Sequence, residues 1–396
     1  MRASLRRPLG VALMFATNGV AISSLLPWYP TLKDQWALND ALFGVIVAAI
    51  AIGSLLSATL PAWAEQRFGA RPTMVVGTLI TAVLLVAVGF SPNALVLTLF
   101  LLLFGIFDTI IDVSQNVAAV RVQNELGKSI MSSLHACWSL GAVLGGALAT
   151  AAAVSDVSLP VHLSTIAAAE ILLVLLAAWM MGDVNEEAAP IESAEEAEEK
   201  GEEKSSELSP RVFLIALPVA IVALSGTVVE DIGNNWAALS AAVLTSVSLQ
   251  AAGAAYAVVY AAQMVGRFAG DLIINRFGRV AVAQAGGACI ALGGLAVVLA
   301  TNPWILYAGY ALVGWGCATL VPSAYAASAS LPGVAQSTGL TVVSWLMRVG
   351  FLTASPLIGM VSELTTLRVA LTILPVMGVT VVIFARGLNG SVVKQR

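Results

Sequence analysis

The chain has 396 residues, of which 59% are hydrophobic and only 11% are charged, and its mean hydropathy is +0.91. A water-soluble core of this size cannot bury so much apolar surface, so the composition excludes a soluble globular protein and predicts one embedded in a membrane. The net charge of -4 comes from a single segment, because eleven of the 23 acidic residues lie between Asp183 and Glu207.

The first half of the chain carries six apolar segments, each long enough to cross a membrane, which takes about 20 residues. The N-terminus has the basic start of a signal peptide, with Arg2, Arg6 and Arg7. The apolar segment behind it has full span length, so we interpret it as a retained transmembrane helix. The predicted spans are 9–30, 41–63, 73–91, 94–120, 131–154 and 160–182, and they form an N-terminal six-helix bundle over residues 1–182.

A polar segment follows over residues 183–210. It is rich in Glu, Ala and Ser with almost no large apolar side chains, so we predict a disordered cytoplasmic linker. The alternative is an acidic docking segment. Six further spans are predicted at 211–239, 245–269, 279–300, 303–329, 337–360 and 365–386. They form a C-terminal bundle over 211–386, followed by a cytoplasmic tail at 387–396. The predicted fold class is an all-α membrane protein with twelve transmembrane helices.

Basic residues predict the orientation, because Lys and Arg near span ends are retained on the cytoplasmic side. With the N-terminus inside, sixteen of the nineteen basic residues are cytoplasmic, whereas Lys33 and Arg368 lie outside and Arg348 lies within a span. We therefore expect a multi-pass protein of the bacterial inner membrane with both termini in the cytoplasm.

The two halves contain a weak internal repeat. An offset of 209 residues aligns Arg67-Phe68-Gly69 after span 2 with Arg276-Phe277-Gly278 after span 8, and an offset of 208 aligns Trp28 with Trp236. Both pairs occupy equivalent places in the two halves. Parallel six-span repeats are one architecture of transporters, with the binding site near the midplane between the halves.

The segment from Gly266 to Asp271, continued by Asn275 to Arg279, resembles the signature loop between spans 8 and 9 of the major facilitator superfamily. Its counterpart, Glu65 to Arg71, is degenerate because no Asp precedes the Arg. The resemblance covers the whole chain. It implies two pseudo-symmetric six-helix bundles that work by alternating access, and a conformational latch made of Arg67, Arg71, Arg267, Asp271 and Arg276.

A narrower resemblance is to the YbjJ-type bacterial inner-membrane proteins, which are relatives of the fucose:proton symporters. It rests on three patches, namely Asp112 to Gly141, Glu230 with Trp236, and Arg348 to Gly359. One position departs from that subgroup. Where the subgroup often has Asp-Trp in span 7, this chain has Asn235-Trp236, so a proton-carrying role at position 235 is in doubt.

Ionisable side chains inside the predicted spans are the main functional candidates, because each costs at least ~2.5 to 3.5 kcal/mol in mid-bilayer and is normally turned toward a cavity or a partner. Span 4 places four polar residues on one helical face, with i, i+4, i+7 and i+8 spacing. They are Asp108, Asp112, Gln115 and Asn116. A carboxylate shielded from water can bind and release a proton near physiological pH. We predict Asp108, Asp112 and Glu230 as the proton-coupling residues.

In the superfamily, spans 1, 4, 7 and 10 line the central cavity, and the resemblance implies the same here. The predicted substrate-binding residues are Asn18, Asp112, Gln115, Asn116, His135, Asp231, Asn235, Trp236, Trp315, Trp345 and Arg348. Deep tryptophans beside amides and acids suit the apolar face and hydroxyls of a sugar, although they are equally compatible with packing.

Three positions have open interpretations. Arg348 either balances one of the carboxylates or binds a substrate anion. His135 is either a proton relay or an interfacial side chain. Glu170 stands alone among Ala and Leu in span 6, where we expect a packing role.

The sequence lacks the signatures of other function classes. No HExxH, GxGD, GxSxG or phosphate-binding loop occurs, and the three cysteines have no CxxC or Cys/His spacing, so we expect no enzyme, metal or cofactor. We predict a secondary transporter, most simply a proton symporter of a small polar solute such as a sugar. Drug or metabolite efflux is the alternative, and the absence of Pro from span 5 favours uptake. The expected partners are substrate, protons and membrane lipid, without nucleic acid, and we expect a monomer.

Overall fold

The computed structural model describes residues 3–57, 60–126, 130–182, 210–328, 331–332, 334 and 336–389, and the regular elements in these ranges are all helices. Except for its last residue, the linker predicted over 183–210 lies outside the described residues. So does most of the tail predicted over 387–396.

The first half of the chain contains six helical crossings, several of them broken into shorter pieces. Its helices are α1 (Ala3–Ser23), η1 (Leu26–Trp28), α2 (Tyr29–Gln35), α3 (Asp40–Val47), α4 (Ala49–Leu56), α5 (Leu60–Phe68), α6 (Ala70–Gly89), α7 (Ala94–Leu126), α8 (Met131–Val154) and α9 (Leu159–Met181).

The second half repeats this pattern. Its helices are α11 (Pro210–Asn235), α12 (Ala237–Leu244), α13 (Ala254–Phe277), α14 (Arg279–Leu299), α15 (Pro303–Cys317), α16 (Leu320–Ser328), α17 (Gln336–Leu364), α18 (Leu367–Ala370), α19 (Ile373–Phe384) and η2 (Ala385–Leu388).

The fold class is the predicted one, an all-α membrane protein with twelve transmembrane helices in two six-helix bundles. Ten helices within the described ranges are long and apolar enough to cross a membrane. The other two predicted spans correspond to the α3–α5 segment, whose apolar part Asp40–Leu56 is shorter, and to α13.

The repeat is visible in the backbone. Gly69 and Gly278 have nearly identical angles, with φ 83 and ψ 162 in the first and φ 82 and ψ 154 in the second. Side chains disfavour positive φ, so glycine suits both turns. Each glycine stands between two consecutive helices, which makes the two RFG tripeptides equivalent joints.

Span 8 was predicted in the wrong place. We expected it over 245–269, but the chain forms bends and turns from Thr245 to Gly253, and α13 runs from Ala254 to Phe277. Hydropathy ends a span at charged residues, whereas helical hydrogen bonding continues through them. The signature segment expected as a loop is therefore helical up to Phe277.

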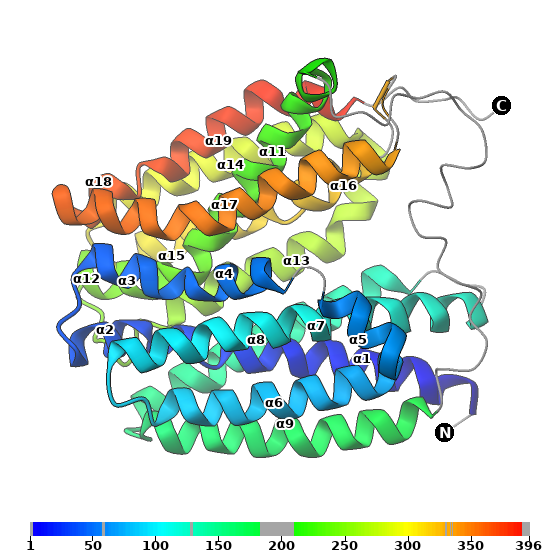
Figure 1. Ribbon diagram of the computed structural model, residues 1–396. Coiled ribbons are helices and arrows are strands. Elements are labelled where there is room, and N and C mark those ends of the chain that lie inside the picture. Colours follow the sequence, from blue (N-terminus) through cyan, green and yellow to red (C-terminus); the bar gives the residue numbers. More distant parts are fainter. Residues whose placement is uncertain are drawn as a thin grey trace.

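The two halves pack against each other along two helix pairs, α3 with α17 and α8 with α13 (Figure 1). Glycines let these pairs approach closely. A Cβ on Gly44 would lie 2.4 Å from the carbonyl oxygen of Ser355, and one on Gly146 would lie 2.6 Å from the Tyr256 ring. Gly253 likewise lies against Pro27 of the other half. Figure 1 shows α2, α3, α12 and α18 at the end of the molecule opposite the N-terminus. We name this end of the molecule the sealed end.

Candidate functional site

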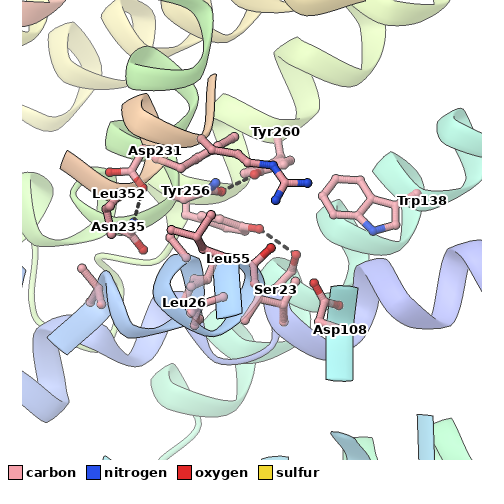
Figure 2. A pocket seen from close by; sticks show the side chains of 18 residues that line it. Ser23, Leu26, Leu55, Asp108, Trp138, Asp231, Asn235, Tyr256, Tyr260 and Leu352 are labelled. Atoms are coloured by element: carbon pink, nitrogen blue, oxygen red, sulfur yellow. Dashed lines mark hydrogen bonds between the residues drawn. The ribbon is translucent and has the colours of Figure 1, made fainter. Parts of the chain in front are cut away.

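A cavity of about 280 Å³ lies between the two halves. Figure 2 shows its polar wall, in which Asp108 and Trp138 come from the first half and Asp231, Tyr256 and Tyr260 come from the second. The remaining lining residues are Ile22, Ser23, Leu26, Val47, Ile50, Ala51, Ser54, Leu55, Asn234, Asn235, Arg348, Phe351 and Leu352. Apolar side chains therefore cover much of the wall, and a few polar groups project between them.

Asp108 on α7 is held in place by α1 and α8. The Asn18 side chain donates from Nδ2 to Asp108 Oδ1 at 2.8 Å, and its Oδ1 accepts a hydrogen bond from Trp138 Nε1 at 2.7 Å. Both ends of the Asn18 amide are thus fixed by neighbours. The Asp108 carboxyl group is oriented at the cavity wall by a neutral donor, without an ion pair within the described residues.

Asp231 on α11 sits in a compact hydrogen-bonded cluster. Ser355 of α17 donates to Asp231 Oδ2, and Asn235 Nδ2 donates to Asp231 Oδ1 at 2.9 Å. The Ser355 hydroxyl accepts from Asn235 at 3.0 Å and from Trp236 Nε1 at 3.1 Å. One hydroxyl group therefore connects two side chains of α11, and Trp236 directly after it, to α17, and it uses its full hydrogen-bonding capacity.

Arg348 brings a positive charge to the same cavity from α17. Its side chain is exposed, and the described residues offer it neither a hydrogen bond nor an ion pair. A guanidinium is always protonated and has five donors in a fixed planar arrangement. The cavity thus combines this cation with two carboxyl groups that are hydrogen-bonded to neutral side chains.

Aromatic rings from both halves adjoin the polar groups. Tyr256 and Tyr260 lie one turn apart on α13 with their ring centroids 4.6 Å apart, and Trp138 lies 6.4 Å from Tyr260. The Tyr256 hydroxyl donates to Ser23 Oγ on α1 at 2.7 Å, and Tyr260 donates to Asn234. These rings provide an apolar surface whose hydroxyls are already engaged.

Glu230 lies outside this lining and forms an ion pair. Arg267 Nη2 is 3.0 Å from Glu230 Oε1, and Gln263 Nε2 donates to the same oxygen at 3.1 Å. The other terminal nitrogen of Arg267 donates to Ser139 Oγ on α8 at 3.1 Å. Arg267 thus neutralises an acid of its own half and also hydrogen-bonds the opposite half.

The sequence profile of the Major Facilitator Superfamily matches residues 11–230. The chain belongs to the major facilitator superfamily. It is a multi-pass membrane protein of a superfamily of secondary transporters. An uncharacterised transporter of Sinorhizobium fredii is 27% identical over 377 residues, covering 95% of this chain and 96% of that protein.

Solved structures share the major facilitator fold at low sequence identity. A mutant of the nucleoside transporter NupG has a TM-score of 0.73 at 12% identity, covering 96% of this chain and 99% of that one. A bacterial homologue of the lysosomal transporter Spinster, solved inward-facing and occupied, has a TM-score of 0.69 at 16% identity, covering 96% of this chain and 95% of that one. At these identities the likeness describes the fold alone.

In this major facilitator chain the predicted polar stripe of α7 divides among three environments. Asp108 lines the cavity, whereas Asp112 is exposed, does not line the cavity and accepts a hydrogen bond from Asn116 at 3.2 Å. Gln115 is buried and donates to the Met14 carbonyl of α1 at 3.1 Å. Of the four residues, only Asp108 reaches the cavity.

Four other predicted binding residues are not part of the cavity lining. His135 is exposed and packs edge-on against Phe15 at 5.4 Å. Trp315 and Trp345 have exposed fractions of 39% and 65%. Trp236 is fully buried and makes an edge-on contact with Phe43 of the other half at 5.2 Å, so it supports the cavity wall from behind.

The predicted latch residues lie on three helices, α5, α6 and α13. Arg267 is inside α13, paired with Glu230, and Arg276 stacks on its neighbour Phe277 at 5.3 Å. Arg67 is exposed at the end of α5, and Arg71 follows on α6. Asp271 lies on α13, but its side chain is outside the described part of the structure.

Sequence reasoning missed several residues of the cavity and its support, above all Tyr256, Tyr260 and Ser355. Tyr256, Tyr260, Gln263 and Arg267 recur at i, i+4, i+7 and i+11, which places them on one helical face, as the spacing on α7 does. That signal was available and identifies a polar stripe on α13. Ser355 carries no comparable signal, because isolated serines are common in membrane helices.

Proposed function

We propose that this chain is a proton-coupled symporter that takes up a small polar solute by alternating access around the central cavity. The main observation in support is the cavity itself. Each half contributes one carboxyl group to it, Asp108 and Asp231, and α17 contributes the cation of Arg348. Charged groups within membrane helices normally face a partner or a substrate pathway.

The contacts between the halves support an inward-facing state. At the sealed end, Lys33 pairs with Asp40 at 2.9 Å, and Asp40 also bonds Ser362 and, through its backbone nitrogen, Glu363 across the halves. The excess of Lys and Arg near the other end of the helices favours that end as cytoplasmic. On this basis the sealed end faces the periplasm of a bacterium and the cavity is poised to exchange with the cytoplasm.

Asp108 is the proton carrier that this geometry favours. Its carboxyl group faces the cavity and is bound by a neutral amide, so it can gain or lose a proton without breaking an ion pair. Glu230 is held by Arg267, and Asp112 does not line the cavity. We therefore narrow the three predicted coupling residues to Asp108.

The lining supports a compact polar solute with an apolar face. About 280 Å³ lies at the small end of ligand pockets. Aromatic rings beside acids and amides can pack on a ring while polar groups bond its hydroxyls. A monosaccharide fits this description. A nucleoside fits it as well, and the structural neighbour NupG is a nucleoside transporter.

The proposed kinship with the fucose:proton symporter group gains one physical argument. Where that group often has an acid at position 235, this chain has Asn235, but Asp231 one turn earlier binds its amide at 2.9 Å. The acid thus reaches the same part of the cavity from the preceding turn of α11.

Transport by the purified chain in proteoliposomes tests the proposal. Counterflow against monosaccharides, nucleosides, amino acids and cationic drugs identifies the substrate class. Accumulation of that substrate under an inwardly directed proton gradient, abolished by a protonophore, is the expected result. Gradient-driven expulsion in place of accumulation would establish the efflux alternative, and counterflow that is indifferent to any proton gradient would contradict proton coupling.

A further inference from the structure

Glu170 on α9 is a buried acid that the proposed site does not use. Its exposed fraction is 3%, and its Oε2 atom is buried without a hydrogen-bond partner among the described residues. An ionised carboxylate in such a place carries a large desolvation cost, and in practice such a group takes up a proton instead. Packing alone does not explain an acid here, since the neighbouring positions of α9 are apolar.

The helix register places Glu170 level with the Asn18–Asp108 pair. A Cβ on Gly10 of α1 would touch Ala177 and Met181 of α9. The two helices run antiparallel, so the residue eight positions after Gly10 lies opposite the part of α9 that contains Glu170. That position of α1 is Asn18, whose amide holds Asp108. Glu170 and Asp108 also interact electrostatically.

A third helix contributes an unsatisfied hydroxyl at the same depth. Gly89 of α6 lies against Pro160 of α9. These two helices are antiparallel, so Thr78, which precedes Gly89 by about three turns, lies at the same depth as Glu170, which follows Pro160 by about three turns. The Thr78 hydroxyl is buried and also lacks a partner in the described part of the chain. The helix packing of this bundle therefore brings an acid and a hydroxyl with unused hydrogen-bonding capacity to the side of α1 opposite the cavity.

The basic groups of the surrounding helices are engaged elsewhere. On α1, Arg6 donates to the Trp179 carbonyl and Arg7 pairs with Glu125. Arg71 stands at the start of α6, and on α8 His135 packs on Phe15 near the start of that helix. On α9 itself, His162 contacts the Ser24 carbonyl. The charged group that acts electrostatically on Glu170 is Asp108, which is itself an acid and so disfavours a negative charge on Glu170.

We infer that Glu170 is a second proton-binding site, protonated in this state, and that its proton exchanges with the cavity through Asp108. The step moves one proton from the Glu170 carboxylic acid to the Asp108 carboxylate and involves no other bond change. The role of this proton in coupling rests on the proposed symport, whereas its presence and its route do not.

Infrared spectroscopy of the purified protein tests the proton directly, without any substrate. The spectrum at neutral pH should contain a carboxylic acid C=O stretching band that is missing in Glu170→Gln, a change that keeps the side-chain shape. The absence of such a difference band would mean that Glu170 is ionised, and would overturn the inference.

The route is tested by transfer to D₂O, which shifts the band when the proton exchanges. We expect the exchange to slow by about tenfold or more in Asp108→Asn, which removes the relay group. Asp112→Asn is the matched control, because Asp112 is an acid of the same helix that does not line the cavity, and it should exchange at the wild-type rate. An unchanged rate in Asp108→Asn would contradict the route. Failure of the symport proposal would show separately, as wild-type counterflow that no proton gradient affects.

Discussion

Gly359 and Asp40 meet where α17 crosses α3, so closely that a Cβ on Gly359 would lie 2.2 Å from the Asp40 carbonyl oxygen. The contact joins the two halves at the sealed end, beside the hydrogen bond between the Asp40 backbone and Glu363. Any side chain at position 359 must push the halves apart at this point. In the proposed alternating access, the stability of the sealed end would therefore set the balance between the two states.

Gly359→Ala should shift that balance toward the state in which the sealed end is open. Overpacking of this kind typically costs about 1–3 kcal/mol. Each 1.4 kcal/mol changes an equilibrium about tenfold, so the open population should rise by about five- to a hundredfold. Met360→Ala is the matched control, because Met360 is the next residue and is half exposed.

The shift can be measured as a distance between spin labels on Leu42 of α3 and Leu364 of α17, which are both exposed. The background chain needs its three cysteines replaced, namely Cys137, Cys289 and Cys317. Gly359→Ala should add a longer distance that Met360→Ala does not add. Identical distance distributions in the two variants would refute the role of this crossing.

Glu230→Gln should destabilise the protein by leaving Arg267 without its acid. The side chains are only 16% and 25% exposed, and removing one partner of a buried ion pair costs about 3 kcal/mol. The expected result is a lower thermal unfolding midpoint in detergent. The double variant Glu230→Gln with Arg267→Gln should recover part of the loss, because it no longer contains an unpaired buried charge. A single variant as stable as the wild type would show that the pair does not hold α11 and α13 together.

Ser355→Ala should weaken the cluster around Asp231, since one hydroxyl binds Asp231, Asn235 and Trp236. Leaving such buried groups short of a partner costs about 1–3 kcal/mol. We expect a lower unfolding midpoint and altered fluorescence of Trp236, whose indole nitrogen loses its acceptor. Thr353→Ser is the control, because the half-buried Thr353 bonds only the Val349 carbonyl of its own helix within the described structure. Equal midpoints in both variants would argue against a structural role for the cluster.

Hydropathy predicted most of the fold because the membrane imposes a nearly uniform apolar length on each crossing. Span 5 was predicted over 131–154 and α8 is Met131–Val154. The method misplaced span 8, because α13 continues through Arg267, Asp271 and Arg276 to Phe277. Those charged residues are helical, and a hydropathy window cannot distinguish a charged helix end from a loop.

The site was predictable only in part. Asp108, Asn18, Asp231, Asn235 and Arg348 were named from their charge or polarity inside the spans, and the structure brings them to the cavity wall or into contact with it. Their partners depend on how the helices pack, which no spacing rule supplies. The pairing of Glu230 with Arg267 illustrates this, because the sequence predicts Arg267 as part of the latch and offers Arg348 as the partner of one of the carboxylates.

Asp108 is central to the proposed coupling, and replacing its carboxyl group separates binding from coupling. Asp108→Asn keeps the size of the side chain beside Asn18, so the cavity should still bind and exchange substrate. It cannot release a proton, so a proton gradient should no longer drive accumulation. Asp112→Asn should behave like the wild type, since Asp112 does not line the cavity.

The most direct measurement is therefore the ratio of gradient-driven accumulation to counterflow in proteoliposomes containing wild type, Asp108→Asn or Asp112→Asn. The proposal predicts that Asp108→Asn retains counterflow while its accumulation falls by about a hundredfold, the scale on which loss of a proton-transfer group acts. Undiminished accumulation by Asp108→Asn would contradict it.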